Sequence, residues 1–164
     1  MIRPVTINDA ARIAEIYNYY VTDTIITFEE DPVDSAEYVG RIEALQAREL
    51  PWLVWESDGI VAGYAYACPW RTRIAYRFTV ESAIYVARDE LGKGIGTKLY
   101  AELIDELRIR NFNSVMGLIS LPNPESINLH ERFGFKKVGQ HAQVGWKFDR
   151  WIDVGVWQLM LRES

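Results

Sequence analysis

The chain has 164 residues, 49% of them hydrophobic, and we expect a single domain over residues 1–164. Its net charge of −5 argues against nonspecific nucleic-acid binding, which needs a basic surface. The single cysteine, Cys68, cannot form an intrachain disulfide, and with only His130 and His141 beside it there are too few ligands for a Cys/His zinc site. No stretch approaches the ~20 apolar residues of a membrane span and no signal-peptide pattern is present, so we expect a cytoplasmic protein with no membrane partner.

Apolar periodicity and turn signals divide the chain into short strands and helices. In the first half we expect a strand at 2–7, a helix from Asn8-Asp9, a helix capped by Ser35, and a hairpin of strands at 52–56 and 60–67. In the second half we expect a strand at 79–86, a helix at 95–108, a strand at 114–120, a helix opened by Asn123-Pro124, and strands at 136–140 and 152–161. This order predicts an α/β (α+β) fold, a mixed sheet with helices on its faces.

A glycine-rich turn joins the strand at 79–86 to the helix at 95–108. It reads Gly-Lys-Gly-Ile-Gly-Thr over residues 92–97. Free N–H groups at the start of a helix attract phosphate, so the turn predicts a site for a phosphate-bearing molecule. It is neither a P-loop nor a dinucleotide fingerprint, since Thr97 stands where a third glycine of the latter belongs. The alternative is a tight turn whose glycines serve geometry alone.

One carboxylate lies in an otherwise apolar strand. Glu81 shares a strand face with Ala83 and Tyr85, and a buried carboxylate is costly unless it is hydrated, paired or functional. The structural alternative is a pair with an arginine such as Arg77. Cys68 is expected to be a small strand residue rather than a nucleophile, and His141 a surface or loop residue.

Several stretches in order, covering nearly the whole chain, resemble the GNAT N-acetyltransferase superfamily. The superfamily's pyrophosphate motif, Arg/Gln-x-x-Gly-x-Gly/Ala, matches at Gly94 and Gly96, whereas Leu91 replaces the usual Arg or Gln. Residues 79–86, 123–131, 133–135 and 145–154 are similar to the phosphinothricin acetyltransferase and methionine sulfoximine/sulfone acetyltransferase group. The resemblance implies a GNAT fold, with a mostly antiparallel central sheet whose splayed central strands bind acetyl-CoA.

The resemblance also implies roles for particular residues. Glu81 would accept the proton of the amine, directly or through water. His130 stands where many relatives have a tyrosine and would protonate the leaving thiolate; its alternative is a helix histidine held by packing. Acetyl-CoA contacts are expected from the main chain of Ile84, Tyr85 and Val86 and from Gly92, Lys93, Gly94, Ile95, Gly96, Thr97 and Asn123.

Arginines and aromatic residues precede the Glu81 strand. Arg71 and Arg77 could clamp the carboxylate of an amino acid through paired N–H bonds, and each could instead form a surface ion pair. By resemblance, Arg71 and Arg77 match the methionine-derivative branch, whereas other positions look more like the phosphinothricin branch. The candidate contacts to the acceptor, the substrate whose amine receives the acetyl group, are Phe28, Arg71, Ile74, Ala75, Tyr76, Arg77 and Val144.

Together these features predict an enzyme that transfers acetyl from acetyl-CoA directly to the amine of a small amino acid-like compound, without a metal. One alternative is acetylation of a peptide or protein terminus or of a polyamine. Another is an acyl-CoA-binding sensor without turnover, which the departure at Leu91 favours. A homodimer is expected from the resemblance and from the aromatic-rich tail around Trp146, Trp151 and Trp157, although these tryptophans could be core residues.

Overall fold

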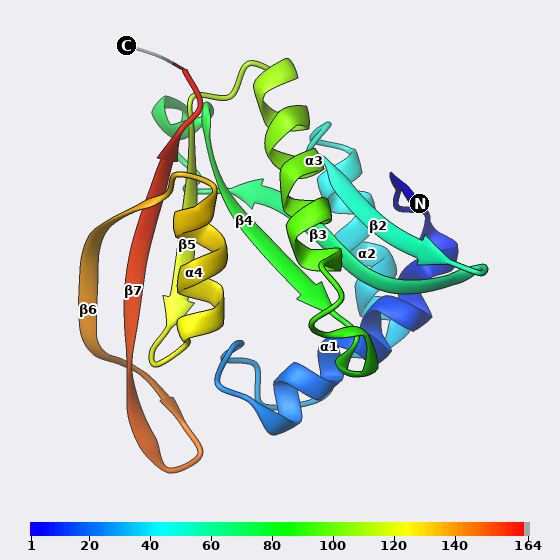
Figure 1. Ribbon diagram of the computed structural model, residues 1–164, viewed down its shortest axis with the longest axis horizontal. Helices are drawn as coiled ribbons and strands as arrows, with labels where there is room; N and C mark the ends of the chain where they lie inside the picture. The colour runs from blue at the N-terminus through cyan, green and yellow to red at the C-terminus, as the bar shows by residue number, and fades with distance from the viewer. Residues whose placement is uncertain (163–164) are drawn as a thin grey trace.

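A seven-stranded sheet runs through the molecule, and the structure, a computed structural model, describes residues 1–162 (Figure 1). In spatial order β1-β2-β3-β4-β5-β7-β6, the strands are β1 (Ile2–Pro4), β2 (Trp52–Ser57), β3 (Ile60–Pro69), β4 (Thr79–Val86), β5 (Ser114–Ser120), β7 (Arg150–Met160) and β6 (Lys136–Lys147). The helices are α1 (Ala10–Asp23), α2 (Ser35–Gln46), α3 (Ile95–Ile109) and α4 (Pro124–Arg132). Three short 3-10 turns, Ile7–Asp9, Ile74–Tyr76 and Arg88–Glu90, complete the elements.

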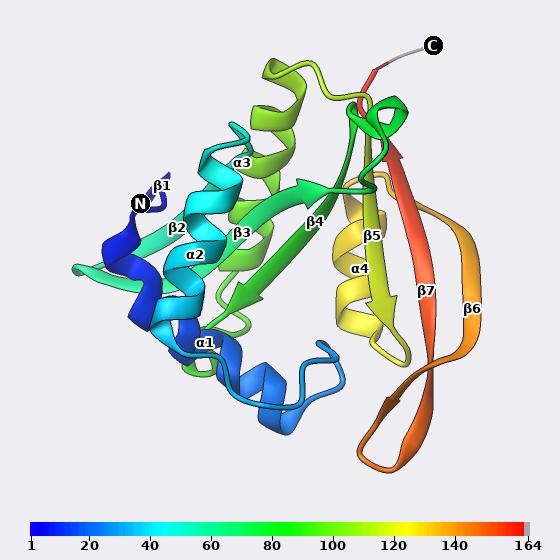
Figure 2. The same cartoon turned by 180° about the vertical axis from the view of Figure 1, so that it is seen from behind.

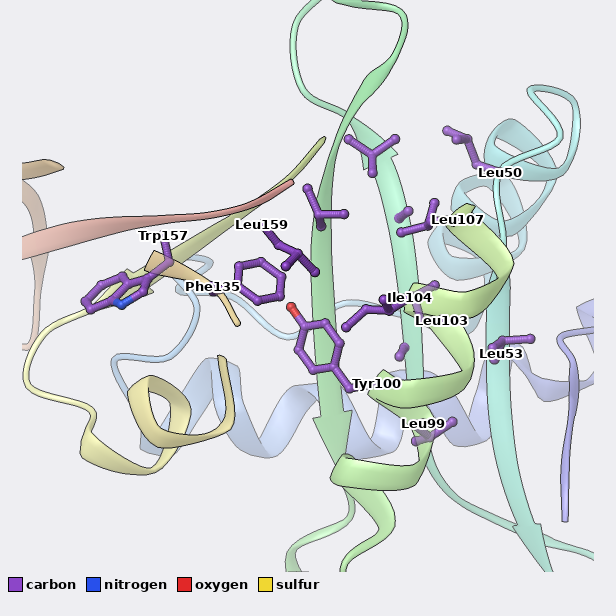
Figure 3. Close-up of a cluster of buried hydrophobic side chains, with 14 of the residues drawn as sticks. Leu50, Leu53, Leu99, Tyr100, Leu103, Ile104, Leu107, Phe135, Trp157 and Leu159 are labelled. Carbon is purple, nitrogen blue, oxygen red and sulfur yellow. The ribbon is translucent and has the colours of Figure 1, made fainter. Parts of the chain in front are cut away.

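Helices cover both faces of the sheet (Figures 1 and 2). On one face, α1 and α2 bury Ile13 and Ile42 against the aromatic surface of β2 and β3. On the other, α3 buries Leu99, Leu103 and Leu107, spaced four residues apart, against the central strands (Figure 3). The spacing of these leucines keeps them on one side of the helix, and their burial fixes α3 against the sheet.

Strands β4 and β5 form the only parallel pair in the described sheet, and they separate early. Their ladder spans Thr79–Glu81 on β4 and Ser114–Met116 on β5. Beyond Glu81, β4 keeps its antiparallel partner β3 but has no partner on the β5 side, and the two ribbons diverge (Figure 1). The divergence opens the middle of the sheet and leaves one edge of β4 without a strand partner beyond Glu81.

The longer, strongly periodic elements agree with the sequence prediction. The hairpin of β2 and β3 pairs Ser57 with Ile60 around the Asp58-Gly59 turn, as expected. Helix α3 extends one residue past the predicted 95–108. Strand β4 has the predicted bounds, and so does β5. Asn123 caps α4, its Oδ1 atom accepting from the Ser126 amide at 3.1 Å.

Several predicted boundaries are wrong, among them the ends of β3 and β7 by one or two residues, and three further differences have a clear physical cause. Strand β1 ends at Pro4 rather than at residue 7, because Thr6 donates its amide to Asp9 at 2.8 Å and opens a 3-10 turn. Asp34, not Ser35, caps α2, and its carboxylate accepts from the Glu37 amide at 2.8 Å. Strand β6 continues to Lys147 instead of stopping at residue 140, because β7 supplies hydrogen-bond partners on both sides of a bulge.

Candidate functional site

A central pocket of about 460 Å³ lies where β4 and β5 part. Its walls come from five places: the loop between α1 and α2, the Trp70-Arg71 segment that follows β3, strand β4, the end of β5 with α4, and the hairpin of β6 and β7. Glu81 and His130 both line it, although they are 49 residues apart in sequence and belong to different elements. The structure therefore brings the two candidate catalytic side chains to one cavity.

A second hollow, the glycine groove, has a volume of about 500 Å³ and follows the turn before α3. Gly92, Gly94, Gly96, Thr97 and Asn123 line it, together with Ile95, Ile84 and Val86. The groove shares Ile26, Ile84 and Ser126 with the central pocket, so the two hollows adjoin. A long ligand held in the groove can thus reach the central pocket.

The backbone of the glycine turn suits an anion. Gly94 is the N-cap of α3 and has φ 78°, a left-handed conformation that favours glycine. No side-chain hydrogen bond caps this helix start, so its first N–H groups are available for a phosphate. The lysines are engaged elsewhere: Lys93 Nζ pairs with Glu90 at 3.0 Å, and Lys98 Nζ lies 5.0 Å from the Trp55 ring centroid. The main-chain N–H groups of the turn are therefore suited to an anion, while the two lysine ammonium groups lie next to other partners in this structure.

Glu81 is half-buried at the point where the β4–β5 ladder ends, opposite Cys68 on β3. Burial raises the pKa of Glu81 above its usual value, and the positive charge of Arg71 opposes that shift only in part. The alternative pairing with Arg77 is wrong, since Arg77 Nη1 donates to the Ile74 carbonyl at 3.1 Å. Among residues 1–162, Glu81 has no salt-bridge partner. A carboxylate in this state is suited to accept a proton.

His130 is buried in a chain of hydrogen bonds that crosses from α4 to α3 and β4. Its Nδ1 atom lies 2.7 Å from the Ser126 carbonyl oxygen, which can only accept, so Nδ1 carries a proton. Its Nε2 atom lies 2.9 Å from the Tyr100 hydroxyl, which also contacts the Ser82 hydroxyl. Burial lowers the pKa of His130, so the imidazole is neutral at pH 7 and Nε2 accepts from Tyr100.

Tyr100 and Ser82 were not among the predicted site residues. Tyr100 lies on the apolar face of α3, and Figure 3 shows its hydroxyl among core side chains near Phe135. A phenol in such a stripe needs a hydrogen-bond partner, which is the one sequence signal that could have drawn attention to it. The partner itself, His130, lies 30 residues away and only the fold brings it near.

The residues predicted to contact the substrate that accepts the acetyl group separate into two groups. Phe28, Arg71 and Val144 line the central pocket. Ile74, Ala75 and Tyr76 form an exposed 3-10 turn outside its lining, and Arg77 follows that turn; Ile74 is 76% exposed. His141, expected to be a surface or loop residue, is an exposed residue of β6 that does line the pocket. No local sequence signal marked His141, because its place is set by the pairing of β6 with β7, where it lies opposite Val154.

Cys68 lies in β3, as expected for a small strand residue, and burial raises the pKa of its thiol to about 12. A thiol with this pKa stays protonated at neutral pH and is a poor nucleophile. The part of the chain that the structure describes contains no group of three His, Cys, Asp or Glu side chains that could hold a metal. It also contains no helix long and apolar enough to cross a membrane.

Comparison with known proteins identifies the class of this fold and site. Residues 2–156 match the acetyltransferase (GNAT) domain family, and the chain belongs to that family. A phosphinothricin N-acetyltransferase of Streptomyces viridochromogenes is 41% identical over 96% of this chain and 85% of its own length. An L-methionine sulfoximine/L-methionine sulfone acetyltransferase of Salmonella typhimurium is also 41% identical, over 94% of this chain and 91% of its own.

Solved structures show the same fold. An acetyltransferase from Salmonella typhimurium, solved with its cofactor acetyl-CoA, has a TM-score of 0.97 and 40% identity over 100% of this chain and 95% of that one. A ribosomal-protein-alanine N-acetyltransferase from Brucella melitensis has a TM-score of 0.96 and 37% identity over 98% of this chain and 99% of that one. The expected GNAT fold, with its mixed sheet and helices on both faces, is confirmed.

We predict that His130 is neutral at pH 7 and protonated at Nδ1, because its burial disfavours the imidazolium and Ser126 fixes the tautomer. Nitrogen-15 NMR of the histidine rings would show one protonated and one unprotonated nitrogen, with protonation beginning only below the usual histidine pKa. The His141→Gln variant assigns the remaining signal to His130. An imidazolium at pH 7, or a proton on Nε2, would contradict the hydrogen-bond directions given above.

Proposed function

We propose that this chain is an acetyl-CoA-dependent N-acetyltransferase that acts by direct transfer on small amino acid-like substrates of the phosphinothricin, methionine sulfoximine or methionine sulfone type. The observation that carries the proposal is the junction of the two hollows: a carboxylate with raised pKa lines the pocket that adjoins the anion-binding groove. The proposal treats residues 1–164 as one catalytic domain in the cytoplasm and needs no metal.

The glycine groove would hold acetyl-CoA. Its pyrophosphate would lie on the main-chain N–H groups of residues 92–97, and Lys93 and Ile95 would contribute through their backbone. The edge of β4 that lacks a strand partner at Ile84, Tyr85 and Val86 would pair with the pantetheine arm as an added strand, next to the Val86 carbonyl that accepts from the Tyr20 hydroxyl. Asn123 uses its carbonyl oxygen to cap α4, which leaves its amide N–H₂ available for the same ligand. Because these contacts are mostly main-chain, Leu91 in place of Arg or Gln is compatible with binding.

Glu81 would act as the base. An ammonium substrate must lose a proton before its nitrogen can attack the thioester carbonyl, and the raised pKa of Glu81 improves its match to an amine. The new N–C bond forms as the C–S bond breaks, the nitrogen gives up a second proton, and the CoA thiolate gains one. Glu81 would take the first proton and release it to solvent. His130 begins neutral, so it would take up the second proton at Nε2 before it protonates the sulfur. One cycle then yields the amide, CoA with its thiol protonated, and one proton released to solvent.

Arg71 would bind the carboxylate of the acceptor. It lines the central pocket and its positive charge acts on Glu81, which places a cation near the reacting amine. Its guanidinium lies over the Trp70 ring, 4.0 Å from the centroid, with Nη1 donating to the Trp70 carbonyl. The stacking leaves other N–H donors for a carboxylate or a phosphinate. Phe28 and Val144 would supply the apolar walls for the rest of the substrate.

Peptide or protein N-termini form the second candidate class of acceptor, favoured by the similarity to the Brucella melitensis structure. A polyamine fits less well, because Arg71 brings positive charge to the pocket. An acyl-CoA sensor without turnover is the remaining alternative. Measuring CoA release with phosphinothricin, methionine sulfoximine, methionine sulfone, a short peptide and a polyamine separates these proposals, since each predicts a different set of active acceptors.

The Glu81→Gln variant is expected to lose about 100-fold or more in kcat with its acetyl-CoA affinity within about twofold of the parent, because only the proton acceptor is removed. In the parent, kcat/KM should fall as the pH drops below the raised pKa of Glu81, since protonation abolishes the base. The Glu43→Gln variant, on the exposed side of α2, is the control. Activity of Glu81→Gln within a few-fold of the parent at neutral pH would exclude Glu81 as the base.

The Arg71→Gln variant is expected to raise the KM of an amino acid acceptor by about 10-fold or more, the range for a lost hydrogen bond to a charged group. The Arg77→Gln variant should leave that KM within about twofold, because Arg77 lies outside the pocket lining. Steady-state kinetics at saturating acetyl-CoA measure both. A large effect at Arg77 with none at Arg71 would reverse this assignment and restore Arg77 as the clamp.

We also propose that the chain forms a homodimer through the hairpin of β6 and β7. Trp146 and Trp151 meet edge to face, 4.7 Å between ring centroids, and both are about half exposed, as is Phe148. Trp157 is a core residue instead, with 2% exposure. Exposed aromatic groups on one hairpin favour a protein partner, and a second copy supplies the same surface.

We predict a dimer mass in sedimentation at micromolar concentration. The Trp151→Ser variant should shift the equilibrium toward monomer, because it removes apolar area from the hairpin. The Ile109→Ser variant removes a still more exposed apolar side chain from the end of α3 and should leave the mass unchanged. A parent protein that sediments as a monomer would contradict the proposal.

A further inference from the structure

The loop between α1 and α2, residues 24–34, forms one wall of the central pocket. Ile26, Thr27 and Phe28 line the pocket, and Ile26 also reaches the glycine groove. The loop contains no helix or strand of its own, so its position depends on what holds it. Figure 2 shows that the loop lies near the hairpin of β6 and β7, across the opening from β4.

A lysine on that hairpin reaches the loop. Lys147 is the last residue of β6, and with 2% exposure it is one of the most buried charged side chains in the described structure. Its Nζ atom donates to the Thr27 carbonyl oxygen at 2.8 Å. Burial lowers the pKa of Lys147, and the acidic residue whose charge acts on it is Glu30 in the same loop. Burying an ammonium is costly, so its place here calls for a compensating contact.

Two further contacts hold the same short segment. The Tyr17 hydroxyl of α1 lies 2.6 Å from the Thr27 hydroxyl, so Thr27 is bonded from two sides. The Phe28 ring packs on Gly145 of β6 so closely that a Cβ atom there would lie 2.4 Å from it. The loop is thus fixed to α1 at one side and to the hairpin at the other.

We propose that Lys147 is a positioning residue that ties the loop at residues 24–34 across the central pocket and thereby sets how tightly the acceptor is held. The inference rests on the proposed function, because it assigns the pocket to the acceptor. Lys147 itself does not line the pocket; it acts through Thr27 and the adjacent Phe28. The hairpin therefore controls the acceptor side of the site, while the glycine turn controls the cofactor side.

The test replaces Lys147 by methionine, which keeps the length and apolar stem of the side chain but not the donor. The matched control is Lys137→Met on the same strand, where the ammonium bonds the exposed Gln140 at 2.6 Å. We expect Lys147→Met to raise the KM of the acceptor about tenfold, as for loss of a bond from a charged donor, with the KM of acetyl-CoA within twofold. Lys137→Met should change neither constant.

Hydrogen exchange provides a readout that does not depend on the acceptor. The amides of residues 25–31 should exchange several-fold faster in Lys147→Met than in the parent and in Lys137→Met, with the amides of β4 unchanged. The same experiment on Tyr17→Phe removes the other bond to Thr27 and should also speed exchange in the loop.

Unchanged exchange in the loop would overturn the inference, and so would equal changes in the KM of acetyl-CoA and of the acceptor. A fall in melting temperature with exchange that becomes equally faster across the whole fold would overturn it as well. That result would mark Lys147 as a general packing residue. Absence of turnover in the parent with every acceptor would count against the proposed function alone. Faster loop exchange in Lys147→Met would then still support the inference that Lys147 holds the loop at residues 24–34 in place.

Discussion

The separation of β4 from β5 after Glu81 is the constraint on which the rest of the site depends. While the strands are paired, their backbone groups satisfy each other. Once they part, β4 keeps only β3, and its other edge has no strand partner, although the Tyr20 hydroxyl bonds the Val86 carbonyl there. The gap also determines where the side chains of the two candidate catalytic residues lie. β4 carries Glu81 to one side of it, and β5 leads into α4, which carries His130 to the other. A fully paired sheet would have no room for a substrate between them.

Burial within this gap shifts the pKa values of the two groups in opposite directions and favours the neutral form of both. It raises the pKa of the carboxyl at Glu81 and lowers the pKa of the imidazole at His130, because both shifts favour the neutral form. The raised pKa brings Glu81 closer to the range in which a carboxylate accepts a proton from an amine, whereas the lowered pKa leaves His130 neutral at pH 7. The hydrogen bonds through Tyr100 and Ser126 then fix which nitrogen of His130 carries the proton. The fold, rather than any single residue, tunes this chemistry.

The sequence prediction was accurate where an element is set by residues close to it in the sequence, and less accurate where distant residues set it. Helix α3 and the hairpin of β2 and β3 are set by nearby residues, and their positions agreed closely with the pattern. The cap of α2 moved by one residue, since Asp34 and Ser35 are both good caps and only backbone geometry selects between them. Strand β6 was underestimated because glycine and polar residues give it no clear alternation, whereas pairing with β7 extends it to Lys147.

By itself the sequence determined the family, the glycine turn before α3 and the candidate pair of Glu81 and His130, because these lie in short motifs whose residues are close along the chain. Only the tertiary structure decided that Arg71 lines the pocket while Arg77 does not, that Tyr100 bonds His130, and that Lys147 ties down Thr27. Each of these depends on which side of an element a side chain leaves and on contacts between distant segments. The local sequence pattern carries no information about which distant segments come into contact. The packing of the tertiary structure decides that.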